Sequence, residues 1–266
     1  MKKFTSLFSC FLLSLSLFLS LFSCVKYSTE TKKIDKGDTL IIAHRGLSGL
    51  EVENTEQAFI VAGERSYYGI ESDVRKTSDG KFVMCHDADL KRIAGVKVDV
   101  ESSTLSELQA IPLLDSTGKK NPDLHLSTLE SYISICKEYD KQAILELKSE
   151  FTEEEIGSII EIIKSYGYLD RVTFISFDYD NLLYVRSHLP SQPAMYLFSK
   201  MSDGIIEKLT RDKIDVGIKY TKLTKSNLDS FHEAGLSVNC WTVDSKFLAE
   251  LYIKWGVDYI TTNIIE

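Results

Sequence analysis

The fold is decided by residues 142–188, which read QAILELKSEFTEEEIGSIIEIIKSYGYLDRVTFISFDYDNLLYVRSH. Two short apolar runs, 142–147 and 171–177, have the length and composition of buried strands. The segments that follow them, 152–166 and 179–188, carry apolar residues at helical spacing. A strand–helix–strand–helix order predicts parallel strands joined by helical crossovers.

The same alternation extends over most of the chain. Further strands are expected at 40–44, 70–75, 81–86, 194–198, 216–220, 236–242 and 257–261, and further helices at 54–66, 127–139, 203–210, 224–234 and 245–255. Gly235 and Gly256 end the last two helices just before the next strand. Repetition over about 240 residues predicts an α/β fold, a (β/α)8 TIM-type barrel. A doubly wound open sheet is the alternative, but the glycine-rich phosphate loop that usually follows its first strand is missing.

One connection is too short for a crossover helix. Only Lys76-Thr77-Ser78-Asp79-Gly80 separates the strands expected at 70–75 and 81–86, and Asp79-Gly80 is a hairpin turn signal. An antiparallel fold about this turn would set Asp73 near His86. It would also explain nine expected strands where a regular barrel needs eight. Residues 88–125 are predicted to form a loop-rich excursion with a short helix near 104–109.

The first 24 residues have a different character. Lys2 and Lys3 precede an uncharged run of Leu, Phe and Ser, which is typical of a secretory signal over residues 1–23. The ending Leu21-Phe22-Ser23-Cys24 resembles the bacterial lipobox, in which the cysteine is lipidated. The alternative is an uncleaved anchor, since an apolar run of roughly 20 residues can span a bilayer.

Both interpretations place the rest of the chain outside the cytoplasm. Residues 24–38 are expected to form a polar tether and residues 39–266 the barrel domain. The protein is then an exported bacterial membrane lipoprotein facing the periplasm or the cell exterior. Loss of Lys2 and Lys3 takes the net charge from −8 to −10, which argues against binding nucleic acid through net charge. The remaining cysteines are scattered and odd in number, and are expected to be small buried hydrophobic residues.

Ionisable side chains gather at the ends of the expected strands. In chain order these are His44 and Arg45, Glu71 and Asp73, His86, and Glu146 and Lys148. Each taken singly has an ordinary structural explanation, such as a loop cap or a hydrogen-bonded core residue. Together, three carboxylates on one rim would repel, and a divalent cation is the simplest relief; oxygen ligands favour Mg²⁺ or Ca²⁺. The positive side chains of Arg45 and Lys148 suit a phosphate, and the two histidines suit acid–base catalysis. The set therefore predicts hydrolysis of a phosphoester.

These motifs resemble the glycerophosphodiester phosphodiesterase family over roughly residues 40–263. The resemblance is carried, in order, by His44-Arg45-Gly46, Glu53-Asn54-Thr55, Glu71-Ser72-Asp73, Asp79-Gly80, His86-Asp87, Glu146-Leu147-Lys148 and Trp241-Thr242-Val243. Val52 stands where the family usually has proline, and the segment 125–129 lacks the Ile-Pro that the family often has. These departures concern loop shape more than chemistry.

The resemblance implies a phosphatidylinositol-phospholipase-C-like barrel and a metal-dependent hydrolase. It would convert glycerophosphodiesters, such as glycerophosphocholine or glycerophosphoethanolamine, to glycerol 3-phosphate and an alcohol. It also implies the following assignments: a metal held by Glu71, Asp73 and Glu146, an acid–base pair of His44 and His86, and phosphate contacts from Arg45 and Lys148. Trp241 and Phe177 are expected to line the substrate pocket, with core packing as the alternative. Asn54 is expected to cap a helix, unless it and Glu53 orient Arg45.

Two other functions remain open at this stage. The same barrel could act on lysophospholipids or sugar phosphodiesters, or the chain could be a surface lipoprotein that binds phosphodiesters without turnover. A glycosidase with paired carboxylates is disfavoured, because Glu71 and Asp73 would be too close and both histidines idle. The sequence does not choose between Mg²⁺ and Ca²⁺, between attack by water and a cyclic phosphate, or between the two histidines as acid. It also leaves the oligomeric state open.

Overall fold

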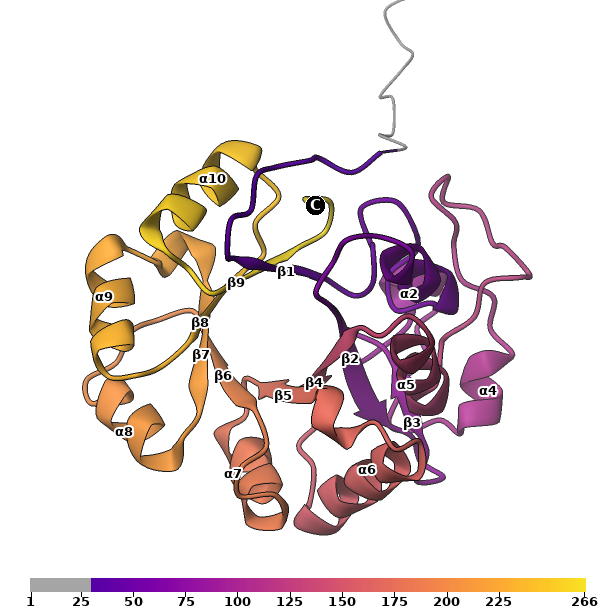
Figure 1. Cartoon of the computed structure of the whole chain (residues 1–266). Helices are drawn as coiled ribbons and strands as arrows, with labels where there is room; N and C mark the ends of the chain where they lie inside the picture. Colours follow the sequence, from indigo (N-terminus) through magenta and orange to yellow (C-terminus); the bar gives the residue numbers. More distant parts are fainter. Residues whose placement is uncertain (1–29) are drawn as a thin grey trace, which may run out of the picture. The chain divides into compact units, whose positions relative to one another are not determined.

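A computed structural model describes residues 30–266, and in this part of the chain eight parallel strands close into a barrel (Figure 1). The eight barrel strands are β1 Leu40–Ala43, β2 Gly69–Lys76, β4 Gln142–Leu147, β5 Val172–Ser176, β6 Ala194–Phe198, β7 Asp215–Lys219, β8 Val238–Trp241 and β9 Tyr259–Thr262, and the short strand β3 Phe82–Met84 lies beside β2 outside the ring. Their order is β1-β9-β8-β7-β6-β5-β4-β2-β3, and the pairing of β1 with β2 closes the ring. The predicted (β/α)8 barrel is therefore confirmed.

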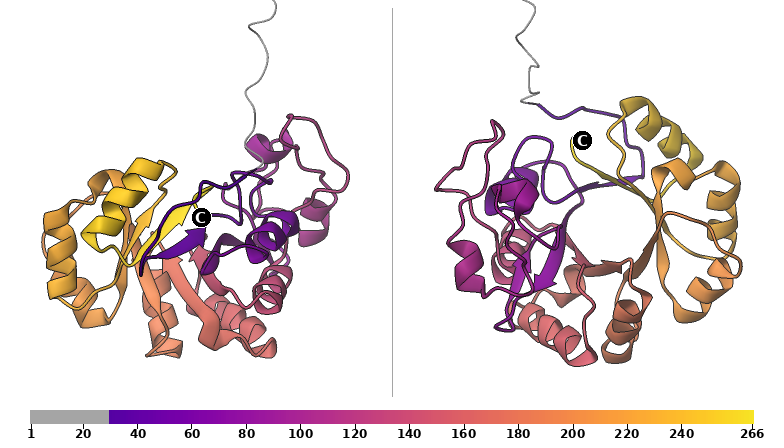
Figure 2. Two further views of the ribbon diagram at one scale, coloured as in Figure 1. Left: turned by 45° about the horizontal axis from the view of Figure 1, so that its top comes forward. Right: turned by 180° about the vertical axis from the view of Figure 1, so that it is seen from behind.

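Helices surround the barrel on its outside, as both views in Figure 2 show. The main ones are α2 Glu56–Gly63, α5 Leu129–Glu138, α6 Glu153–Ser165, α7 Tyr179–His188, α8 Ile205–Asp212, α9 Lys225–Glu233 and α10 Lys246–Trp255. Several begin at a threonine whose hydroxyl accepts a backbone N–H of the first turn, as at Thr152 and Thr224. Gly235 and Gly256 take positive φ where α9 and α10 end, as predicted.

The predicted hairpin is also present. Strand β3 pairs antiparallel with β2, with Val74 opposite Met84 and Lys76 opposite Phe82. Gly80 takes φ +69° in the turn, a conformation that glycine adopts without strain. The backbone N–H of Cys85 donates to the carbonyl of Asp73 at 2.8 Å, so the hairpin sets His86 beside the acidic strand.

Residues 88–125 form an excursion with a small apolar core of its own. It contains α3 Lys91–Ala94 and α4 Leu105–Gln109. Its core is made of Val83, Cys85, Leu90, Ile93, Ala94, Val100, Leu108, Leu113 and Leu126. The sequence predicted α4 but not α3, because a four-residue helix is too short to show a period. The excursion packs against β3, next to the predicted site.

The chain joins the folded body earlier than its polar composition suggests. Residues 32–34 form a backbone ladder with residues 264–266, in which Lys32 N donates to Ile264 O and Ile34 N to Glu266 O. The predicted signal segment and Cys24 lie outside the described residues. None of the helices in the described part is long and apolar enough to cross a membrane.

Successive side chains of each strand face opposite sides of the barrel wall. Phe174 of β5 is fully buried between the sheet and the helices, within the main apolar core. Its neighbour Ile175 faces inward, where it packs with Ile42, Ile144 and Leu197. Two apolar layers therefore hold the wall in place, one inside the barrel and one under the helices.

Phe174→Ala should lower the free energy of unfolding by about 3–5 kcal/mol, because it removes a large ring from the closely packed outer layer. Phe177→Ala is the matched control, since Phe177 is 45% exposed just beyond the end of the same strand. Its loss should cost less than about 1.5 kcal/mol, mainly one aromatic contact. Urea unfolding of both variants checks this. Equal costs would show that the outer layer is not the principal core.

Candidate active site

A cavity of about 120 Å³ opens toward the carboxyl ends of the strands. One side of its wall is polar and contains His44, Arg45, Glu71, His86, Glu146 and Lys148. The other side is largely apolar and contains Ile175, Phe177, Leu197 and Trp241. The structure thus brings together in one wall nearly all the side chains that the sequence singled out, and Asp73 lies directly behind them, fully buried.

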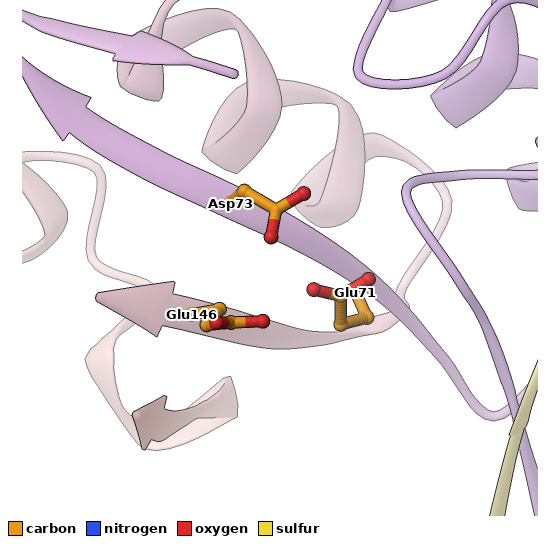
Figure 3. A group of neighbouring side chains, drawn as sticks. All are labelled: Glu71, Asp73 and Glu146. Carbon is orange, nitrogen blue, oxygen red and sulfur yellow. The ribbon is translucent and has the colours of Figure 1, made fainter. Parts of the chain in front are cut away.

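Three carboxylates converge from two neighbouring strands (Figure 3). Strands β2 and β4 pair in parallel with Asp73 opposite Glu146, and Glu71 lies two residues earlier on the same face of β2. One ligand oxygen from each residue lies within 4.8 Å of the others, and all three side chains are buried. The register of two strands therefore builds an acidic cluster.

The cluster is electrostatically strained. Burial and the nearby charges of Asp73 and Glu146 raise the pKa of Glu71 well above its usual range. Burial and the charge of Asp73 raise the pKa of Glu146 to about 7. Burial also acts to raise the pKa of Asp73, but Arg45 and Lys148 outweigh it and lower that pKa to about 2. Two of the three carboxylates therefore lack sufficient compensating charge.

Unpaired oxygens show where that charge would fit. Glu71 Oε1, Asp73 Oδ1 and Glu146 Oε1 are buried and make no hydrogen bond to any described residue. Buried polar atoms are normally paired, so three orphaned oxygens in one cluster need an explanation. Their chemistry is the oxygen donor set of a hard divalent cation such as Mg²⁺ or Ca²⁺. The residues therefore fit the implied metal.

Two side-chain cations border the cluster without being fully engaged by it. Arg45 Nε lies 3.3 Å from Asp73 Oδ2, and Lys148 Nζ lies 2.9 Å from Glu146 Oε1. These are ion-pair distances, but neither contact has hydrogen-bond geometry, so N–H groups remain for another acceptor. A further contact of Arg45, from Nη1 to Glu53 Oε1 at 2.9 Å, holds its guanidinium in place. Lys148 and Arg45 are thus placed to receive an anion.

The turn after β1 requires glycine. Arg45 takes φ +55° and its backbone N–H donates to Glu71 Oε2 at 2.8 Å. Gly46 follows with φ +74°, and a Cβ there would lie 2.6 Å from the backbone carbon of Ala58. The tight contact with α2 explains the Gly of the His-Arg-Gly run, because a side chain would push the preceding residues out of the site.

His44 is held by an amide. Its Nδ1 lies 2.7 Å from Asn263 Oδ1, and Asn263 Nδ2 donates to Asp244 Oδ2 at 2.6 Å. Because Asp244 fixes the amide orientation, Asn263 Oδ1 accepts and His44 Nδ1 donates. His44 Nε2, 4.0 Å from Glu71 Oε2, is then the proton acceptor on the cavity side. Burial, followed by the charge of Arg45, lowers the pKa of His44 to about 4.

His86 is held by a carboxylate. Its Nδ1 lies 2.7 Å from Asp87 Oδ1, and its backbone carbonyl accepts from Arg75 Nη2 at 2.8 Å. Burial lowers the pKa of His86, whose side chain is only partly buried. Asp87 Oδ2 in turn accepts from Arg92 Nε at 2.7 Å. The two imidazoles therefore have partners of different charge.

Asn54 is not the helix cap that the sequence suggested. The cap of α2 is Thr55, whose hydroxyl accepts from Ala58 N. Asn54 takes φ +57° and donates from Nδ2 to Asp73 Oδ2 at 2.9 Å, while its Oδ1 accepts from Ser72. Asparagine tolerates this left-handed conformation, in which the amide contacts Ser72 and Asp73 of β2 and does not cap the helix. The alternative expectation, that Glu53 orients Arg45, agrees with their hydrogen bond.

Three further residues at the site were not among those assigned from the sequence. Asn263 follows β9 directly and Asp244 lies three residues after the end of β8, so polar residues after strand ends were the available signal. Arg92 had no such signal, because it lies in the irregular excursion and reaches the site only through folding.

The apolar side of the cavity is formed by an aromatic pair. Phe177 and Trp241 pack edge to face with ring centroids 5.3 Å apart. Lys148 Nζ lies 5.7 Å from the centre of the Phe177 ring, which joins this wall to the charged side. The cavity thus offers a ligand a charged face and an apolar face.

Comparisons with known proteins agree with this geometry. A sequence model described as the glycerophosphoryl diester phosphodiesterase family matches residues 44–266. A glycerophosphodiester phosphodiesterase of Caldanaerobacter subterraneus subsp. tengcongensis is 30% identical over 234 residues, which cover 85% of this chain and 94% of that protein.

Solved structures show the same similarity. A phosphodiesterase of Oleispira antarctica, in complex with the product sn-glycerol-3-phosphate, aligns with a TM-score of 0.79 at 27% identity, over 84% of this chain and 92% of the other. A glycerophosphodiester phosphodiesterase of Parabacteroides distasonis gives a TM-score of 0.71 at 28% identity, over 88% and 94%.

Glu71→Gln should stabilise the protein in chelator, on the order of 1–3 kcal/mol near neutral pH, because it removes a buried carboxylate that has one unpaired oxygen and two acidic neighbours. A carboxyl whose pKa is raised by folding destabilises the fold increasingly as pH rises above its ordinary range. The difference in thermal midpoint from wild type should therefore widen from pH 5 to pH 8. Adding Mg²⁺ or Ca²⁺ should raise the midpoint of the wild type but hardly that of the variant.

The exposed Glu154 on α6 provides the control, and Glu154→Gln should give no such gain. A Glu71→Gln midpoint below that of chelated wild type would show that the cluster is not strained.

Proposed function

Because the chain belongs to the glycerophosphoryl diester phosphodiesterase family, and is therefore a phosphoric diester hydrolase, we propose that it hydrolyses glycerophosphodiesters such as glycerophosphocholine and glycerophosphoethanolamine. The products are glycerol 3-phosphate and an alcohol. The observation that carries the proposal is the meeting of three buried carboxylates, two cations and two imidazoles around one cavity. The product bound by the Oleispira antarctica relative supports the substrate class.

Glu71, Asp73 and Glu146 would hold one divalent cation, Mg²⁺ or Ca²⁺. When bound, such a cation supplies positive charge that neutralises phosphodiester oxygens and favours attack at phosphorus. Arg45 and Lys148 contribute in the same direction from the protein itself. Their N–H groups left free by the acidic cluster would bind the phosphate, with Arg45 as a fixed planar donor and Lys148 as a mobile charge.

The two histidines suit different halves of the proton transfer. His44 Nε2 carries the lone pair, and its amide partner is uncharged, so His44 would take the proton from the attacking group, which is water or the neighbouring glycerol hydroxyl of the substrate. His86 has a carboxylate partner that favours the imidazolium, so His86 would give its proton to the departing alcohol. The P–O bond to the attacking oxygen forms while the bond to the alcohol breaks. Attack by water gives glycerol 3-phosphate directly, whereas attack by the glycerol hydroxyl gives a cyclic phosphate that water then opens to the same product.

The apolar wall suits the carbon skeleton of a small substrate. Phe177 and Trp241 would pack against the methylene groups of glycerol while the phosphate lies on the charged side. A cavity of about 120 Å³ favours a small diester over a substrate with an acyl chain inside the barrel. A lysophospholipid could bind only with its chain outside this cavity.

We further propose that the mature chain is a lipoprotein, processed after residue 23 and anchored through Cys24. The basic start, apolar run and Leu-Phe-Ser-Cys ending support this proposal. The enzyme would then act on glycerophosphodiesters outside the cytoplasm, in lipid and glycerol metabolism at the cell envelope.

The substrate and the metal can be tested in one assay. The protein without residues 1–24 should release glycerol 3-phosphate from glycerophosphocholine or glycerophosphoethanolamine. Chelator should abolish the activity, and one of Mg²⁺ or Ca²⁺ should restore it. Lysophosphatidylcholine serves as the competing substrate. Turnover of that lipid alone, or full activity in chelator, would overturn the proposal.

His44→Ala and His86→Ala should each lower the rate on glycerophosphoethanolamine by on the order of 100-fold or more. The two should differ on glycerol p-nitrophenyl phosphate, whose phenolate leaves without protonation. His86→Ala should recover most of its loss on that substrate, whereas His44→Ala should not. His125→Ala, on an exposed loop, is the control. If both variants kept near wild-type rates the pair would not be catalytic, and an equal loss on both substrates would remove the acid role from His86.

A further inference from the structure

Arg92 connects the excursion to two sides of the catalytic cavity. Its Nη1 and Nη2 donate to both oxygens of Glu53 at 2.7 Å, and its Nε donates to Asp87 Oδ2 at 2.7 Å. One planar guanidinium therefore joins two carboxylates that come from different parts of the chain. This arrangement uses the fork geometry that distinguishes arginine from lysine.

Each of those carboxylates holds one member of the proposed machinery. Glu53 Oε1 accepts from Arg45 Nη1 at 2.9 Å, and Asp87 Oδ1 is 2.7 Å from His86 Nδ1. Arg92 thus contacts Arg45, assigned to phosphate binding, through Glu53. It contacts His86, assigned to proton transfer, through Asp87. Neither Glu53 nor Asp87 belongs to the acidic cluster.

We propose that Arg92 is a positioning residue, which sets the direction of Arg45 through Glu53 and of His86 through Asp87 at the same time. The assignments of Arg45 and His86 rest on the proposed function. What is added is a catalytic role for the excursion, whose packing places Arg92.

Electrostatics explains why the contact needs a cation. Burial acts to raise the pKa of Glu53, but the charges and hydrogen bonds of Arg92 and Arg45 outweigh it and lower that pKa. Burial likewise acts to raise the pKa of Asp87, but Arg92 and His86 outweigh it and lower that pKa. Both carboxylates are therefore anionic and share Arg92 between them. Without that charge they would repel each other, and each would be free to rotate away from its catalytic partner.

The excursion fixes the position of this guanidinium. Ile93 and Ala94, the residues after Arg92 on α3, are buried in the excursion's own core. Ile93 O accepts from Leu114 N at 2.7 Å, which ties α3 to the far arm of the excursion. Gly95 then ends the helix with φ +71°. Arg92 projects from a short helix that packing and hydrogen bonds hold on both sides.

The test compares Arg92→Ala, Arg92→Lys and Lys91→Ala in the full-length protein in detergent. Misplacing catalytic groups by about 1 Å can reduce rates on the order of 100-fold, so Arg92→Ala should lower kcat by 10-fold to 100-fold. Arg92→Lys should recover only part of this loss, because one ammonium cannot match three N–H contacts. Lys91→Ala removes the same charge from the same helix at an exposed position, and should stay within about twofold of wild type.

A double-mutant cycle separates positioning from a general effect on the fold. If Arg92 acts through His86, Arg92→Ala should cost much less in the His86→Ala background than in wild type, measured at high enzyme concentration on glycerophosphoethanolamine, whose departing alcohol needs the proton of His86. Arg92→Ala should also weaken inhibition by glycerol 3-phosphate, which reports on Arg45.

Two results would overturn the inference. One is an Arg92→Ala enzyme within twofold of wild type, and the other is an equal loss in both backgrounds. If Arg92→Ala fails to fold, the same cycle is run with Arg92→Lys, which keeps the charge. If the wild-type protein were inactive on every glycerophosphodiester, the proposed function would be refuted instead. That result would be known before any variant is compared.

Discussion

Three carboxylates packed within 4.8 Å of one another, away from water, are the constraint on which the rest of the structure depends. The register of β2 with β4 creates the constraint, and the two apolar layers of the barrel wall must outweigh its cost. Nearby polar side chains compensate part of the negative charge. Asn54, Arg45 and Lys148 all serve Asp73, whereas the side chain of Glu71 receives one backbone N–H and little else. The site is thus assembled at a net cost to the fold that a bound cation would relieve.

The surroundings of the cluster are unequal in a way that matters for chemistry. On one side, His44 is hydrogen-bonded to the amide of Asn263, whose orientation is fixed by Asp244. On the other, His86 is hydrogen-bonded to the carboxylate of Asp87, which also accepts from Arg92. The two histidines therefore differ in how strongly their partners favour the doubly protonated, charged ring. The difference lies in their partners, since both rings face the same cavity.

The sequence revealed what depends on neighbours along the chain. Strand–helix alternation predicted the barrel, Asp79-Gly80 predicted the hairpin, and the spacing of Glu71 and Asp73 predicted a shared face. It failed where distant segments meet. Asn263 contacts His44 across 219 positions and Arg92 contacts Glu53 across 39, and nothing local marks either pair. Asn54 was misassigned for a different reason, because Thr55 beside it is an equally good cap and a backbone turn decides between them.

The last strand in chain order has a consequence for biosynthesis. β9 pairs with both β1 and β8, so it seals the barrel, and Asn263 directly after it supplies the partner of His44. A ribosome-bound chain that still lacks this stretch has a gap between β1 and β8, and its His44 lacks the contact with Asn263. The ring of strands is therefore closed, and His44 has its amide partner, only once β9 and Asn263 have been made.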